Sequence, residues 1–243
     1  MGPFPRRPGD LVRGNVDPGH TARNRPNGLH GRIVALRGRH FSAEYDGAMD
    51  AGLVLDVAVK IAVVAFAVYP IARPESSHFQ GKAMGVRAWL YPLVTLVIPA
   101  IWLLSGRPGP YPFVADIALG LPFLVDAAAN VFGLFAIRGF DAIPHASGWC
   151  FLAIAFGLGV APLVAERWIA FGLVLGFGAV IDILWEIGEF AMLRSGASGL
   201  QLTYENTIQD LAMSLGGAAV GALLVVTILW PSSTIPATPF GWS

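Results

Sequence analysis

The chain has 243 residues, of which 55% are hydrophobic and 13% are charged, and its formal net charge is zero. A soluble domain carries about 25% charged residues, so this composition argues against an ordinary soluble fold. The zero net charge gives no field that would attract a nucleic acid, and no nucleic-acid partner is expected. The single cysteine, Cys150, excludes an intrachain disulfide and a cysteine-based metal motif.

The N-terminal region, residues 1–50, differs in composition from the rest of the chain. Residues 1–40 are rich in Arg, Pro and Gly and hold few large apolar side chains. Such a composition cannot bury enough surface to fold, so the sequence predicts a mostly disordered tail over 1–50, with a short surface helix over 41–50. Eight arginines precede position 40, and the positive-inside rule therefore places this tail in the cytoplasm.

Six apolar segments of about 20 residues follow the tail, and this is the length that a helix needs to cross a bilayer. We therefore predict an all-α, polytopic membrane bundle over 51–230 in the cell membrane, with a short uncharged C-terminal tail over 231–243. The predicted spans are 51–72, 84–104, 113–137, 144–164, 169–193 and 207–230. Two small-residue pairs, Gly172 with Gly176 and Gly217 with Gly221, predict close helix packing in the last two spans.

Ionisable residues inside these spans are the features that most need an explanation, because each costs about 2.5–3.5 kcal/mol at the centre of a bilayer. Asp56 and Lys60 in the first span are four residues apart, and we interpret them as a structural pair that neutralises itself. Four further polar pairs have the same spacing, which puts both members on one helix face: Asp126 with Asn130, Asp141 with His145, Asp182 with Glu186, and Asn206 with Asp210.

The depth of these pairs predicts that they share one pocket. Alternate spans run in opposite directions, and each pair lies near the same end of its span. With the tail in the cytoplasm, that end is the outer leaflet. The acids of the predicted pocket are Asp126, Asp141, Asp182, Glu186, Glu189 and Asp210.

So many carboxylates in a poorly hydrated pocket need either protons or a bound cation. The cations expected nearby are Arg138, Arg194 and His145. Oxygen ligands together with one imidazole suit a divalent metal of the Mg²⁺, Mn²⁺, Zn²⁺ or iron type.

Three segments resemble the YjdF-like family of uncharacterised bacterial inner-membrane proteins: FDAIPHASG (140–148), DILWEIGEF (182–190) and TYENTIQDLAMSLGGAAVGA (203–222). The resemblance implies a multi-span fold with a shared polar site. It matches family motifs at Asp141 and His145, at Glu186 and Glu189, and at Thr207 and Asp210. The family's motif carries an acid at the position of Asn206.

Our leading hypothesis is a divalent-metal-dependent enzyme that acts on a lipid or a lipid-linked substrate. Its metal ligands would be Asp141, His145, Glu186 and Asp210. Asp182 or Glu189 would act as the general base that activates a water molecule. Supporting polar contacts would come from Asp126, Asn130, Asn206 and Thr207. Two alternatives stay open: a proton- or cation-coupled transporter, and a non-catalytic assembly subunit whose polar cluster fixes helix packing.

Overall fold

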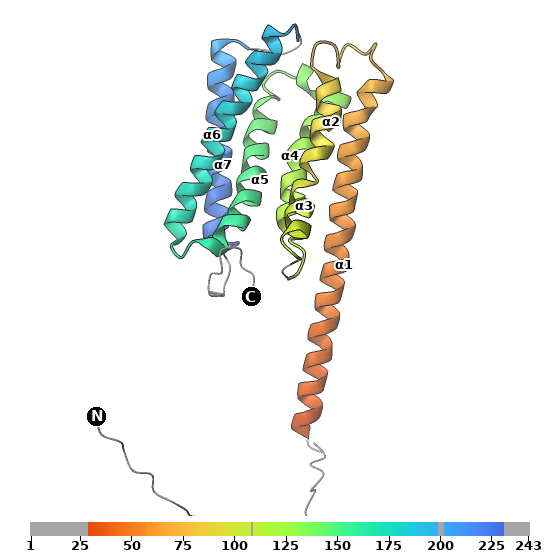
Figure 1. Cartoon of the computed structure of the whole chain (residues 1–243), viewed down its shortest axis with the longest axis vertical. Helices are drawn as coiled ribbons and strands as arrows, with labels where there is room; N and C mark the ends of the chain where they lie inside the picture. The colour runs from red at the N-terminus through yellow and green to blue at the C-terminus, as the bar shows by residue number, and fades with distance from the viewer. Residues whose placement is uncertain (1–28, 108, 199–201, 231–243) are drawn as a thin grey trace, which may run out of the picture. The chain divides into compact units, whose positions relative to one another are not determined.

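The computed structural model describes residues 29–107, 109–198 and 202–230, and the regular structure within these ranges is entirely helical (Figure 1). The helices are α1 (Leu29–Ala72), α2 (Met84–Val94), α3 (Val97–Leu104), α4 (Phe113–Val131), α5 (Ala142–Val160), α6 (Arg167–Arg194) and α7 (Tyr204–Thr227). Short 3₁₀ turns follow α4 at Leu134–Ala136 and α5 at Ala161–Leu163.

Six segments within the described ranges are long and apolar enough to cross a membrane, which confirms the six apolar helices predicted from the sequence. They are Ala51–Ala72, Met84–Leu104, Phe113–Val131, Ala142–Leu163, Arg167–Arg194 and Tyr204–Thr227. Large apolar side chains lie on their outer faces: Val54 is 69% exposed, Trp168 is 70% exposed and Leu104 is 89% exposed. Soluble monomers rarely expose so much apolar surface, whereas helices that face lipid regularly do.

Helix α1 begins at Leu29, whereas the sequence predicts a mostly disordered tail over 1–50 with a helix only over 41–50. No proline occurs between Pro26 and Pro70, so nothing in this stretch removes a helical backbone donor. Once the apolar segment has formed a helix, extending it adds one hydrogen bond per residue without a new nucleation cost. Residues 29–50 are therefore helical, while 1–28 and 231–243 lie outside the described residues.

The bounds of the last three predicted spans differ from the observed helices by one to three residues, and two earlier spans differ more. The second is divided into α2 and α3 at Thr95 and Leu96. Pro99 explains the division, because it lacks the N–H that would bond to the carbonyl of Thr95. The third was predicted to reach residue 137 but ends at Val131, because Gly133 adopts a left-handed φ of 68° that turns the chain out of the helix.

The tightest packing in the molecule is between α5 and α7, which lie side by side (Figure 1). A Cβ atom added at Gly217 would stand 2.0 Å from the carbonyl oxygen of Ala146, and one at Gly221 would stand 2.4 Å from that of Cys150. Glycine at these two positions therefore lets the backbones approach closely, as predicted. The pair at 172–176 faces open space instead, so it makes no such contact.

The connections between the helices define one end of the bundle. α4 and α6 finish at this end, and α2, α5 and α7 begin there (Figure 1). We call it the polar end, because the polar residues predicted in the apolar segments lie on the turns of helix nearest to it. α4 packs against α5 and also contacts α2, so residues from all these helices can meet at the polar end.

Candidate functional site

A cavity of about 440 Å³ lies between α2, α4, α5, α6 and α7. Its volume is within the usual range for small-molecule sites. Its polar and ionisable lining residues are Lys82, Arg87, Tyr91, Asp126, Asn130, Asp141, His145, Glu189, Asn206 and Asp210. Residues one to three turns further from the polar end, such as Leu119, Phe123 and Leu152, make its deeper wall apolar.

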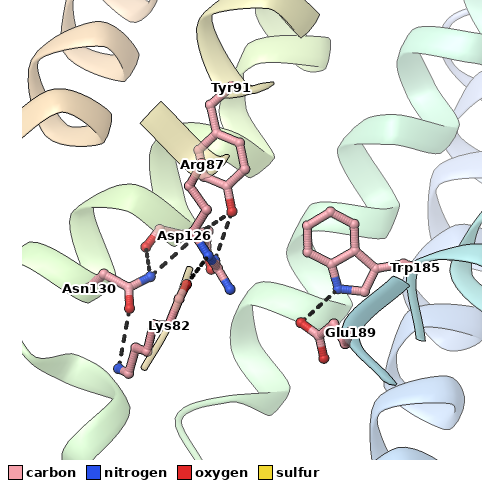
Figure 2. A network of polar contacts seen from close by, with 7 residues as sticks. All are labelled: Lys82, Arg87, Tyr91, Asp126, Asn130, Trp185 and Glu189. Atoms are coloured by element: carbon pink, nitrogen blue, oxygen red, sulfur yellow. Dashed lines mark hydrogen bonds and ion pairs between the residues drawn. The ribbon is translucent and has the colours of Figure 1, made fainter. Parts of the chain in front are cut away.

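One wall of the cavity carries a hydrogen-bonded ion pair between Arg87 of α2 and Asp126 of α4 (Figure 2). The guanidinium also donates to the hydroxyl of Tyr91 at 2.8 Å, and that hydroxyl donates to the Asp126 carboxylate at 2.5 Å. Asn130 donates to the same carboxylate oxygen at 3.3 Å. The charge of Asp126 is therefore matched by a buried cation, and the pair links α2 to α4.

Lys82 lies in the turn before α2 and extends toward the same wall (Figure 2). Its Nζ donates to Oδ1 of Asn130 at 3.2 Å and lies 5.0 Å from the ring centroid of Phe135. Burial, and next the neighbouring charge of Arg87, lower the pKa of Lys82 from its ordinary value, while Asp126 and Asp141 oppose this shift. Within the described ranges Lys82 forms no ion pair.

The wall on α6 presents Glu189, whose Oε1 accepts a hydrogen bond of 3.1 Å from the indole of Trp185 (Figure 2). Only one of its carboxylate oxygens is used by this bond. The other is left for a ligand in the cavity, since Glu189 is partly exposed and lines it.

The remaining acids converge on His145. Asp141, His145 and Asp210 each offer one donor atom, and these three atoms lie within 4.8 Å of one another. His145, Asp182 and Glu186 form a second group that meets the same limit. Donor atoms that share one ion at about 2.1 Å stand roughly 3–4 Å apart, so either group needs only a small contraction to bind a metal.

Two neutral side chains orient the first group. Nδ1 of His145 lies 3.1 Å from Oγ of Ser214, and its Nε2 lies 3.8 Å from Oδ1 of Asp210. Asn206 donates to Oδ2 of Asp141 at 3.4 Å. Contacts of this kind fix the ring and the carboxylate in the way that outer-shell partners of metal ligands do.

Several buried carboxylate oxygens have no hydrogen-bond partner among the described residues. They are Oδ1 of Asp116, Oδ1 of Asp182, both oxygens of Glu186 and Oδ1 of Asp210. The 3.8 Å contact from His145 is too long to count as a hydrogen bond to Asp210. A buried carboxylate without a partner is costly, so these groups need protons or a cation. The donor set around His145 therefore fits a divalent metal.

The structure brings most of the predicted site residues together, but it divides the predicted metal ligands between the two groups. Asp141, His145 and Asp210 line the cavity, whereas Glu186 is buried beside Asp182 and does not. Asp182 is 2% exposed, so it is shielded from the space where a substrate would bind. Thr207 lies in the first turn of α7 and is not a lining residue.

The cations of the site differ from those predicted from the sequence. Arg138 and Arg194 are exposed and do not line the cavity, whereas Lys82 and Arg87 do. The four-residue spacing of Arg87 and Tyr91 was a signal for this, because it places both on one face of α2.

A separate charged cluster joins α1 to the first turn of α4. Lys60 lies 2.5 Å from a carboxylate oxygen of both Asp56 and Asp116. The hydroxyl of Tyr111 also donates to Asp116, which is 1% exposed. The predicted pair of Asp56 and Lys60 is thus part of a larger group that includes Asp116. This group lies toward the opposite end of the bundle, because α4 begins there.

No protein-family model, curated protein or solved structure matches the chain. The resemblance to the YjdF-like family stays a prediction.

Proposed function

We propose that the chain is a multi-pass membrane protein and a divalent-metal-dependent enzyme that acts on a lipid or lipid-linked substrate. The observation that supports it most is the convergence of Asp141, His145 and Asp210, with unpartnered acid oxygens beside them, on a cavity whose deeper wall is apolar. A polar head would meet the acids, and an apolar chain would occupy the deeper part.

The proposed metal is of the Mg²⁺, Mn²⁺, Zn²⁺ or iron type, and Asp141, His145 and Asp210 would hold it. When bound, such an ion polarises an ester or phosphoryl oxygen and makes a water molecule more acidic. Ser214 would keep Nδ1 of His145 occupied, so that Nε2 is the donor on the side of Asp210.

Glu189 is the better placed of the two predicted general bases, because it lines the cavity and Asp182 does not. Its carboxylate would accept a proton from the attacking water while the water oxygen bonds to the acyl or phosphoryl centre and the bond to the leaving oxygen breaks. Glu189 would then return that proton to the leaving oxygen, which departs as the alcohol. Trp185 would hold Oε1 in place during this step. In the proposed orientation the N-terminal tail is cytoplasmic and the polar end lies at the outer leaflet of the cell membrane.

The test is lipid turnover by the full chain in proteoliposomes made from a polar-lipid extract, with the products followed by mass spectrometry. We expect a lipid species to be consumed only when a divalent metal is supplied. Glu189→Gln should slow this at least about 100-fold, as for loss of a general base. Glu205→Gln, which removes an exposed acid at the start of α7, should not. A lipid profile that metal-loaded protein leaves unchanged would refute the proposal.

A second candidate is a proton- or cation-coupled transporter. It is favoured by the buried cluster of Lys60, Asp56 and Asp116, because charged groups then lie toward both ends of the bundle. The test is uptake of a proton or metal cation into proteoliposomes that contain the full chain. Uptake that Lys60→Met abolishes would support this function over the enzyme.

A further inference from the structure

The acids around His145 exceed what one divalent ion can neutralise. Four carboxylates belong to the two groups that meet at this histidine: Asp141, Asp182, Glu186 and Asp210. The nearest buried arginine, Arg87, is already paired with Asp126. Lys82 donates only to a neutral amide on the other wall, in the part of the chain that the structure describes. A single M²⁺ would neutralise two of the four, so the other two would need protons or a second cation in this poorly hydrated interior.

The second group carries the strongest sign that a cation binds there. Glu186 is 7% exposed, and neither of its carboxylate oxygens has a hydrogen-bond partner among the described residues. Asp182, one helical turn earlier on α6, is 2% exposed and has one such oxygen. Both project toward His145, since donor atoms of all three lie within 4.8 Å of one another.

The two groups are adjacent because they share His145. Asp141 and Asp210 approach it from the start of α5 and from α7, and Asp182 and Glu186 approach it from α6. Two ions held by neighbouring groups of this kind would lie close together, as in two-metal sites, where the separation is roughly 3.5–4 Å. Two divalent ions would also cancel the four carboxylate charges.

We propose that the site holds two divalent cations, the second bound by Asp182 and Glu186 beside the Asp141–His145–Asp210 position. This rests on the proposed function, since it adds a second ion to the same site. It gives Asp182 the role of a metal ligand in place of the general base predicted from the sequence. The second ion lies in the buried interior behind the cavity wall, so it acts mainly on the position of the first.

The experiment is metal counting on the full chain, purified in a neutral detergent, loaded with Mn²⁺ and dialysed. Elemental analysis gives the number of ions per chain, and electron paramagnetic resonance distinguishes an isolated Mn²⁺ from an exchange-coupled pair. We expect two ions per chain and a coupled spectrum for the wild type. Glu186→Gln should leave one ion and the six-line spectrum of isolated Mn²⁺. Glu166→Gln, an exposed acid before α6, should leave two.

Asp182→Asn provides a second variant of the same position in case Glu186→Gln does not give a folded, monodisperse protein. One ion per wild-type chain, or two ions in a folded Glu186→Gln or Asp182→Asn protein, would overturn the second site. The first of these results would leave the proposed function standing, because one ion in the Asp141–His145–Asp210 group is sufficient for it. A wild-type chain that binds no ion would overturn both.

Discussion

Oγ of Ser214 in α7 lies 3.1 Å from Nδ1 of His145 in α5. This contact crosses the most closely packed helix pair in the molecule, where Gly217 and Gly221 let the two backbones approach. Packing between α5 and α7 therefore sets the orientation of the only imidazole in either acidic group. The glycine pair, Gly217 and Gly221, therefore also helps to position His145 in the candidate metal site.

Ser214→Ala should weaken metal binding without disturbing the fold. It removes the partner of Nδ1, so the ring of His145 can rotate and its tautomer is no longer fixed. Loss of such an outer-shell contact typically lowers metal affinity about 10–100-fold. Competitive titration with a metal-binding dye measures the change. Ser147→Ala is the matched control, because that hydroxyl only bonds to the carbonyl of Ile143 within α5. Equal affinities in both variants would contradict the role of Ser214.

Asp126→Ala should destabilise the protein, because it leaves the guanidinium of Arg87 buried without a counter-charge. The expected loss is about 3 kcal/mol, at the lower end for a buried pair, since the Asp126 side chain is 21% exposed. Combining it with Arg87→Met removes the unpaired charge and should restore part of the stability. Unfolding in a denaturing detergent measures all three variants. A double variant whose loss equals the sum of the single losses would show that the residues do not interact.

Gly217→Ala should lower the melting temperature, because its Cβ would stand 2.0 Å from the carbonyl oxygen of Ala146. α5 and α7 must then separate, at a cost of about 2 kcal/mol for overpacking. Gly172→Ala is the control, since a Cβ there meets open space and alanine is the better helix former. We expect that variant to be as stable as the wild type or slightly more so. A Gly217→Ala protein with the same melting temperature as Gly172→Ala would contradict the close packing of α5 and α7.

Lys82 should lose its proton at a lower pH than an ordinary lysine. Burial and the charge of Arg87 lower its pKa, so the positive charge in the cavity is present at low pH and disappears as the pH rises through that lowered value. Reductive methylation with ¹³C and NMR titration reports this directly. The chain has only one other lysine, Lys60, so a Lys82→Arg variant assigns the signal.

Replacing a neighbour of Lys82 tests the cause of this shift. Asp126→Asn removes a charge that raises the pKa of Lys82, and its titration should move to a still lower pH. Arg87→Met removes a charge that lowers the pKa, and the titration should move upward. A midpoint at or above 10.5 in the wild type would mean that Lys82 is not in the environment described here.

Most of the fold could be predicted from the hydropathy of the sequence. The bounds of the first span, 51–72, and of the second, 84–104, agree with the apolar helices observed. The division at Thr95 and the early end at Val131 depend on single backbone effects of Pro99 and Gly133, which a hydropathy average does not register. The helix over 29–40 was missed because composition indicates whether a segment can form a core, and not whether an adjoining helix can extend into it.

The candidate site was only partly predictable. Spacing and helix direction placed Asp141, His145 and Asp210 at one depth, and they do meet. Sequence could not separate lining residues from those buried behind them, because the direction of a side chain around α6 depends on how that helix is rotated against its neighbours. Lys82 and Arg87 were not among the predicted cations, although long side chains near a helix start can extend along the helix into a cavity.

X-ray absorption spectroscopy of zinc-loaded protein tests the central claim most directly. We expect nitrogen and oxygen ligands at about 2.0–2.2 Å from the metal, together with the outer-shell scattering of one imidazole. That scattering should disappear in His145→Asn. A spectrum of the wild type with water-like oxygen ligands alone and no imidazole scattering would contradict the metal site, and with it the proposed enzyme.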